Sequence, residues 1–146
     1  MTGRDDSSFR LRTATMLLAK AREEASRASW REAALFARGA VENAAKAVLA
    51  CLASVPKSHD PAPLLEEALR LPGFPAALAG EAQTLLPVWR RYGMAQHILL
   101  SYGDEQNLID PWSLVTPELA GEAVSAAESA VEFAARCRTA IFGARS

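Results

Sequence analysis

The chain of 146 residues is about the length of one domain, and half of its residues are hydrophobic. Its net charge of −1 gives no overall positive field that would draw the protein onto nucleic acid. Cys51 and Cys137 form no CxxC motif and no Cys/His cluster, so we expect neither a metal site nor another cofactor. No apolar run approaches the ~18 residues of a membrane span, and no signal-peptide pattern opens the chain, which predicts a cytoplasmic protein.

Two long helices are predicted in the first third of the chain. Residues 1–8 are polar and are expected to be a flexible N-terminus, with Ser7 or Ser8 capping a first helix over residues 9–27. A second helix is predicted over residues 30–52, where apolar residues return every three or four positions. The short break between these helices predicts an antiparallel pair.

Capping patterns mark the starts of two further helices. Ser29 and Glu32 have the spacing of a capping box at the start of the second helix. Asp60 followed by Pro61, or alternatively Pro63, would begin a short third helix that the sequence LPGFP ends.

The second half of the chain contains two helical patterns and an interruption. A fourth helix is predicted at residues 76–91. Residues 92–117 contain several glycines and prolines and are expected to be an irregular loop. Thr116 followed by Pro117 is typical of a helix start, and it precedes an alanine-rich last helix. The pattern as a whole predicts one all-α domain over residues 1–146, an up-and-down bundle of four to five helices.

Three motifs in this order resemble those of the HEPN domain family. The second helix contains A-x-E-N-A-A-K-A-V-L, with Glu42 and Lys46. S-H-D-P-x-x-L-L follows from Ser58, and the pair Arg91–Tyr92 ends the fourth helix. Together with the helix order, the resemblance covers most of the chain.

The resemblance implies a homodimer, which the hydrophobic composition of this short chain also favours. Many members of the family are partners of a minimal nucleotidyltransferase in toxin–antitoxin pairs, and others are thought to bind nucleotides. If the resemblance extends to nucleotide binding, it implies that a small set of polar residues in this sequence contacts the nucleotide. These are Arg38, Glu42, Lys46, Arg91 and Tyr92.

A second implication of the resemblance is a metal-independent RNase, whose family motif is an Arg and a His separated by four to six residues. Arg91 and His97 are separated by five residues and would be the catalytic pair. A histidine can move a proton near neutral pH, and an arginine can bind the charged phosphate. Two positions depart from the RNase subset, because Tyr92 stands where a polar residue is common and Leu99 where a Tyr is common.

Structural interpretations of the same residues remain open. Arg38, Glu42 and Lys46 are spaced at i,i+4 and could be surface ion pairs worth about 0.2–0.5 kcal/mol each, or a half-buried network. His97 could be a satisfied histidine in an apolar segment. The run from Ser58 to Asp60 is interpreted as a capping turn rather than a catalytic triad, because neighbouring loop residues do not converge as nucleophile, base and orienting group. The chain could then be a structural helical dimer without a ligand.

Overall fold

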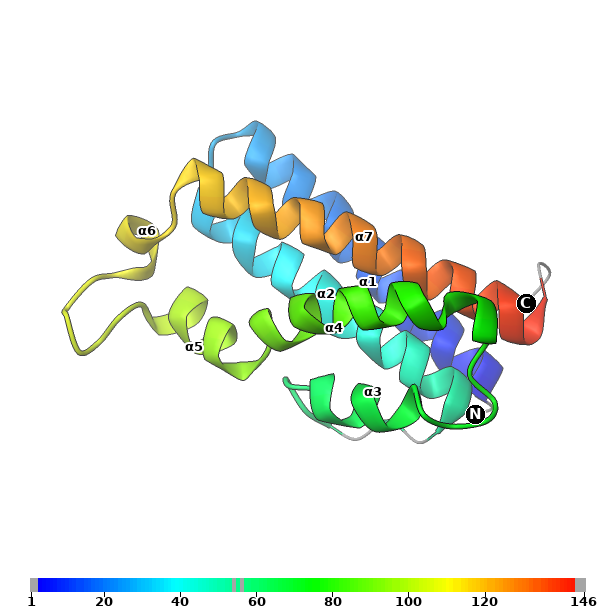
Figure 1. Ribbon diagram of the computed structural model, residues 1–146. Coiled ribbons are helices and arrows are strands. Elements are labelled where there is room, and N and C mark those ends of the chain that lie inside the picture. Colours follow the sequence, from blue (N-terminus) through cyan, green and yellow to red (C-terminus); the bar gives the residue numbers. More distant parts are fainter. Residues whose placement is uncertain (1–2, 54, 56, 144–146) are drawn as a thin grey trace.

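A computed structural model describes residues 3–53, 55 and 57–143 as an all-α bundle, and no strand occurs within these ranges. This confirms the predicted fold class. Figure 1 shows the arrangement of the helices. In chain order they are α1 (Gly3–Ser26), α2 (Trp30–Leu52), α3 (Ala62–Ala68), the 3-10 turn η1 (Ala76–Leu78), α4 (Ala79–Arg91), α5 (Met94–Tyr102), α6 (Pro111–Leu114) and α7 (Pro117–Phe142).

Helix α2 is the centre of the bundle and packs most extensively against α1 and α7. Figure 1 shows these three long helices running alongside one another, and α4 contacts α2 and α7. The face of α2 that they cover is made mainly of alanines, including Ala37, Ala40 and Ala44, which are fully buried. Small side chains let helix axes approach towards the short end of the usual 8–10 Å spacing.

The first helix begins at Gly3, so the predicted start at residue 9 was wrong. The predicted flexible segment is helical from residue 3 onward, and its residues 1 and 2 lie outside the described residues. Ser7 is not a cap but a buried residue inside α1. Its hydroxyl accepts a hydrogen bond from Nε of Arg138 in α7 at 2.8 Å, a contact between distant parts of the sequence that anchors the first turns of α1.

The turn between α1 and α2 joins an antiparallel pair, as predicted (Figure 1). Ala28 adopts φ 58°, and the N–H of Ser29 donates to the carbonyl of Glu24 at 2.9 Å, which closes the C-terminus of α1. Ser29 makes no side-chain cap, so the predicted capping box is absent. The carboxylate of Glu32 instead accepts a hydrogen bond from Nε1 of Trp112 in α6 at 2.8 Å.

Residues 92–117 are not an irregular loop throughout, because they contain α5 and α6. Gly93 and Gly103 flank α5, and Leu100 is its buried residue. The nine residues of α5 are too few for their spacing to identify a helix, and packing against α2 stabilises them instead. Figure 1 shows that the α5–α6 segment extends to the end of the bundle opposite the two termini.

Other helix starts and ends follow the sequence closely. Helix α2 has its predicted bounds, and η1 with α4 covers the predicted fourth helix. The Thr116 hydroxyl accepts a hydrogen bond from the N–H of Leu119 at 3.1 Å, which confirms the predicted cap of α7. At α3, Pro63 occupies the first turn, and the N-cap residue is Pro61 rather than the predicted Asp60. Within the ranges described, no helix has the length and apolarity needed to cross a membrane.

Candidate functional site

Three charged side chains of α2 form a buried ion network. Glu42 accepts hydrogen bonds from Nη2 of Arg38 at 2.6 Å and from Nζ of Lys46 at 3.0 Å. Only 3% of Arg38 and 7% each of Glu42 and Lys46 are exposed. The i,i+4 stripe is therefore a buried network and not a set of surface ion pairs.

Arg38 connects this network to two other segments of the chain. Its Nε donates to the carbonyl oxygens of Tyr92 at 3.1 Å and Gly93 at 3.3 Å, in the turn between α4 and α5. Its Nη2 also donates to the carbonyl oxygen of His59 at 2.7 Å, in the loop before α3. One side chain of α2 thus fixes the positions of both segments.

The carboxylate of Glu42 is ionised at neutral pH. Burial acts to raise its pKa, but hydrogen bonds from Lys46 and His59 and the charge of Arg38 outweigh burial and lower the pKa below the ordinary 4.5. Two cations and one half-exposed imidazole therefore surround a charged acceptor.

Two histidines stack at the edge of this network. The ring centroids of His59 and His97 lie 4.3 Å apart, and the planes differ by 15°. Nδ1 of His59 lies 3.0 Å from Oε1 of Glu42, and Nδ1 of His97 lies 3.4 Å from Nη1 of Arg38. His97 joins the cluster from α5, and His59 joins it from the loop before α3.

The chemistry of the two partners determines which ring nitrogen of each histidine carries a proton. Arginine only donates, so Nδ1 of His97 accepts and the proton of the neutral ring is on Nε2. An ionised carboxylate only accepts, so Nδ1 of His59 carries a proton and donates to Glu42. Burial, Arg38 and His59 lower the pKa of His97 below 6.5, although the charge of Glu42 acts in the opposite direction.

Sequence reasoning did not identify His59 as a site residue. Residues 58–60 do form a turn, because the N–H of Asp60 donates to the Ser58 hydroxyl at 3.0 Å, but this turn does not cap α3 as predicted, since Pro61 is the N-cap residue. The one sequence feature that could have indicated a further role for His59 is its place inside the S-H-D-P motif. Its bond to Glu42, 17 residues earlier in the chain, depends on how the loop lies across α2.

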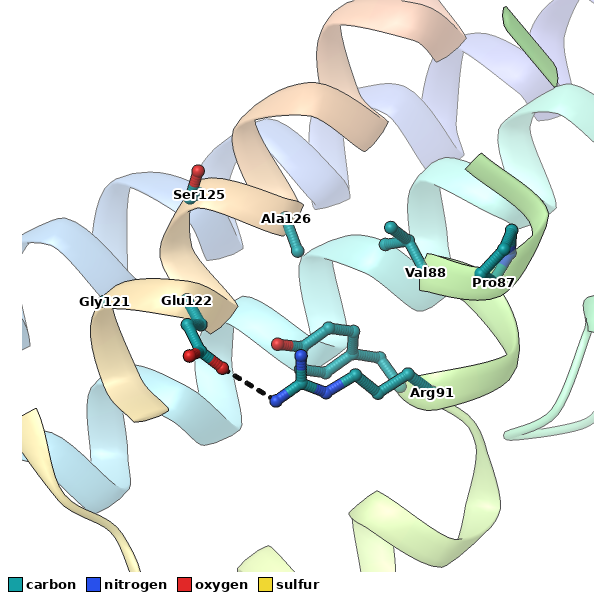
Figure 2. A pocket seen from close by; sticks show the side chains of 8 residues that line it. Pro87, Val88, Arg91, Gly121, Glu122, Ser125 and Ala126 are labelled. Atoms are coloured by element: carbon teal, nitrogen blue, oxygen red, sulfur yellow. Dashed lines mark hydrogen bonds and ion pairs between the residues drawn. The ribbon is translucent and has the colours of Figure 1, made fainter. Parts of the chain in front are cut away.

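Arg91 lies in a different site, a groove of about 580 Å³ between α4 and α7. Figure 2 shows its guanidinium group directed towards Glu122, and the two side chains are joined at 2.8 Å. The guanidinium carbon also lies 5.3 Å from the centroid of the Tyr92 ring, within cation–π range. About half of the Arg91 side chain is exposed.

The structure therefore divides the predicted site residues between two clusters. Arg38, Glu42 and Lys46 lie together, and His97 joins them through Arg38. The carbonyl of Tyr92 contacts this cluster, but its buried ring lines the groove that holds Arg91. Within the described part of one chain, no bond joins Arg91 to His97.

Neither cysteine is placed for nucleophilic chemistry. Burial raises the pKa of Cys137 to about 12 and also raises the pKa of Cys51. Both thiols therefore stay protonated at neutral pH. In the described ranges, no three His, Cys, Asp or Glu side chains come together in a group that could hold a metal ion.

The chain is an all-α bundle whose helices follow the predicted order, and a polar cluster centred on Arg38 lies where α2 meets α4 and α5. These features agree with the class of helical domain that the sequence motifs resemble. The family model of the HEPN domain matches residues 7–138, most of the chain, and the chain belongs to the HEPN domain family. No curated protein matches the chain.

Proposed function

We propose that this chain is a nucleotide-binding HEPN module that holds the phosphate of its ligand at Arg91. The observation that carries this proposal is the position of the guanidinium group. It is half exposed at the edge of the α4–α7 groove, with one carboxylate partner, Glu122. Arginine binds phosphate oxygens through two parallel hydrogen bonds, and an exposed guanidinium can exchange a surface carboxylate for a phosphate.

The rest of the groove suits the other parts of a nucleotide. Pro87, Val88 and Ala126 provide apolar surface against which a base could lie (Figure 2). The hydroxyl of Ser125 lines the same groove and can bond a ribose hydroxyl. Glu122 competes with the phosphate for Arg91, so it tunes affinity in this proposal.

Arg38, Glu42 and Lys46 have a supporting role in this proposal. Their side chains are 4%, 8% and 9% exposed, which leaves little surface for a ligand. Arg38 holds the carbonyl of Tyr92 and so fixes the residue beside Arg91. We therefore propose that these three residues position the groove and do not contact the phosphate.

Thermal unfolding with and without millimolar ATP tests the proposal. A ligand that binds only the folded state raises Tm, so wild type should gain several degrees. Arg91→Ala should gain much less, and Glu122→Gln should gain more because its Arg91 is released. Arg136→Ala is the matched control, since Arg136 makes a similar exposed ion pair between α7 and Glu81 of α4. Equal shifts in wild type and Arg91→Ala would rule out the assignment.

We further propose that the module acts in the cytoplasm as a homodimer and as the partner of a minimal nucleotidyltransferase in a toxin–antitoxin-like pair. The support is membership of the family and a group of exposed apolar side chains on α5 and beyond, including Ile98, Tyr102 and Trp112. Light scattering after size exclusion gives the molar mass and so tests the dimer. Co-purification with the product of a neighbouring nucleotidyltransferase reading frame tests whether the two proteins form a complex. A dimer that binds neither nucleotide nor such a partner would instead be the structural helical dimer.

A metal-independent RNase is the second candidate, with Arg91 and His97 as its catalytic pair. The observation in its favour is the position of His97, which is partly exposed and whose neutral ring Arg38 holds in one tautomer. Arg91 would have to come from the second chain of a dimer or leave Glu122. RNA incubated with the protein in EDTA tests this candidate. Cleavage that is lost in both Arg91→Ala and His97→Ala would support it, and cleavage that persists in His97→Ala would exclude it.

A further inference from the structure

We propose that the surface formed by α5, α6 and the start of α7 binds a cationic amphipathic segment of another protein, which inserts one large apolar side chain into a pocket between these helices. The inference goes beyond nucleotide binding and does not depend on it. The pocket shares only Tyr92 with the groove that holds Arg91.

Helix α5 exposes most of its apolar residues. Its sequence MAQHILLSY contains five large apolar or aromatic side chains, yet Leu100 is the only residue of this helix that is buried. Twelve large hydrophobic side chains are exposed in the described part of the chain, and eight of them lie between Met94 and Leu119. Figure 1 shows this stretch at the end of the bundle opposite the two termini. A concentration of exposed apolar side chains usually marks a binding surface.

A pocket of about 190 Å³ opens within this surface. Its walls are mainly apolar, and Gln96 and the buried Tyr92 are the polar residues that line it. Leu99 and Leu119 also line it and are exposed, so they form its mouth. An apolar cavity of ~150 Å³ holds a benzene ring, so this pocket has room for one Leu or Phe side chain.

Small residues create the space inside the pocket. Ala34 of α2 and Ala123 of α7 are almost completely buried in its wall, and neither has a side chain beyond Cβ. Protein interiors normally leave few voids larger than a water molecule. A side chain that enters through the mouth would therefore fill space that the chain itself leaves open.

The residues around the pocket are acidic. Residues 92–122 contain five Asp or Glu and no Lys or Arg. Glu118 and Glu122 lie one turn apart on α7, beside Leu119 at the mouth of the pocket. Lys and Arg side chains of a partner that placed an apolar residue in the pocket would therefore meet carboxylates next to it.

Two further carboxylates carry charge in the connection between α5 and α6. Hydrogen bonds from Asn107 lower the pKa of Asp104, and hydrogen bonds from Ser113 lower the pKa of Asp110. Both groups are therefore ionised at neutral pH, and they extend the negative charge from α7 to this connection.

Two arginines reach the edges of this surface, and each already has partners. Arg91 pairs with Glu122 at 2.8 Å. The guanidinium carbon of Arg31 lies 5.1 Å from the centroid of the Trp112 ring, and its Nε donates to the carbonyl of Leu100 at 2.7 Å. Five acidic residues against these two cations leave the surface negative, which attracts a cationic partner.

The charge also separates two kinds of occupant. Exposed apolar side chains alone would suit a second copy of this chain as well as a different protein. In a two-fold dimer built on this surface, the same set of carboxylates would come from both chains. Like charges brought together at an interface oppose binding, so a homodimer would form on another face and this surface would take a cationic segment.

Fluorescence anisotropy tests the proposal, with the full-length protein and a labelled amphipathic peptide made of Leu and Lys. The same peptide with Glu in place of Lys is the control for charge, and with Ala in place of Leu it is the control for the apolar anchor. Wild type should bind only the Leu/Lys peptide, and more weakly as the salt concentration rises.

Two pairs of variants locate the binding site. Leu119→Ser should weaken binding about tenfold, as the loss of a central apolar contact does, whereas Leu119→Met should bind like wild type. Glu118→Lys should weaken binding roughly two- to fivefold. Glu128→Lys makes the same charge change on the side of α7 that faces Arg22 of α1, and it should leave binding unchanged. Circular dichroism should show each variant folded.

Five results would overturn the proposal. They are no binding of the Leu/Lys peptide by wild type, equal binding of the Glu peptide, full binding by Leu119→Ser, equal weakening by Glu118→Lys and Glu128→Lys, or a wild-type dimer that becomes a monomer in Leu119→Ser. The last result would make a second copy the occupant. Leu119→Ser and Glu118→Lys should keep the ATP-induced rise in Tm, so failure of nucleotide binding is distinguishable from failure of this surface.

Discussion

The guanidinium group of Arg38 lies 3.4 Å from Nδ1 of His97, while the same group donates to Glu42 at 2.6 Å. One buried cation is thus bonded to both an imidazole and a carboxylate. Since it also donates to the carbonyls of His59, Tyr92 and Gly93, it joins α2 both to the loop before α3 and to the turn between α4 and α5.

Arg38→Ala should be one of the most destabilising changes in the chain. It would leave the buried carboxylate of Glu42 with less compensation and remove the donor from three carbonyls. Breaking a buried ion pair costs about 3–5 kcal/mol, so urea unfolding should show a loss of that order. Arg136→Ala, which removes an exposed pair with Glu81, should cost about 1 kcal/mol or less. Similar losses in the two variants would contradict the role of Arg38.

Protonation of His97 should weaken the fold at mildly acidic pH. In the folded protein its pKa lies below 6.5 because of burial, Arg38 and His59, with Glu42 in opposition. The unfolded chain therefore binds this proton first, and stability falls as pH drops below about 6.5 until the lowered pKa is passed. Tm measured between about pH 7.5 and 5 should fall less steeply for His97→Gln than for wild type. Equal slopes would contradict the prediction.

The long helices could be predicted from the sequence because their information is local. The apolar spacing of residues 30–52 and the Thr116–Pro117 start depend on neighbours within a few positions. The start of α1 could not be predicted in this way. Ser7 has the composition of a cap, but its partner is Arg138, 131 residues later.

The candidate site was predictable only in part for the same reason. The i,i+4 spacing placed Arg38, Glu42 and Lys46 on one stripe, but burial by other segments turned that stripe into a network. His59 and His97 lie in a loop and a short helix, so their stacking depends on where the bundle places both segments. The sequence also could not predict where the Arg91 side chain points, because its partner Glu122 belongs to a helix that begins 26 residues later.

Gly103→Ala should destabilise the connection between α5 and α6. Gly103 has φ 78° and ψ −162°, a conformation that is nearly restricted to glycine. A Cβ there would lie 2.2 Å from the carbonyl oxygen of Ile109, which is backbone and cannot swing away. The expected cost is about 1–3 kcal/mol by urea unfolding.

Gly80→Ala is the matched control for that change. Its Cβ would meet nothing within 4 Å, and the residue lies in α4. Replacing a helical glycine by alanine favours the helix by up to about 1 kcal/mol, so stability should stay the same or rise. A loss of stability in Gly80→Ala equal to that in Gly103→Ala would show that the positive φ and the contact with Ile109 are not the cause.

Ala44→Leu tests whether close packing of α2 is what holds the bundle together. Ala44 is fully buried on the helix that packs against both α1 and α7, so three extra carbon atoms have no space without moving a helix. Overpacking of this kind costs about 1–3 kcal/mol, and thermal unfolding should show a clearly lower Tm. Ala140→Leu, at an exposed position of α7, should change stability by no more than about 0.5 kcal/mol. If Ala44→Leu were equally harmless, the helices around α2 would have to be separated by enough space to accept a large side chain, and the alanine face would not be setting their distance.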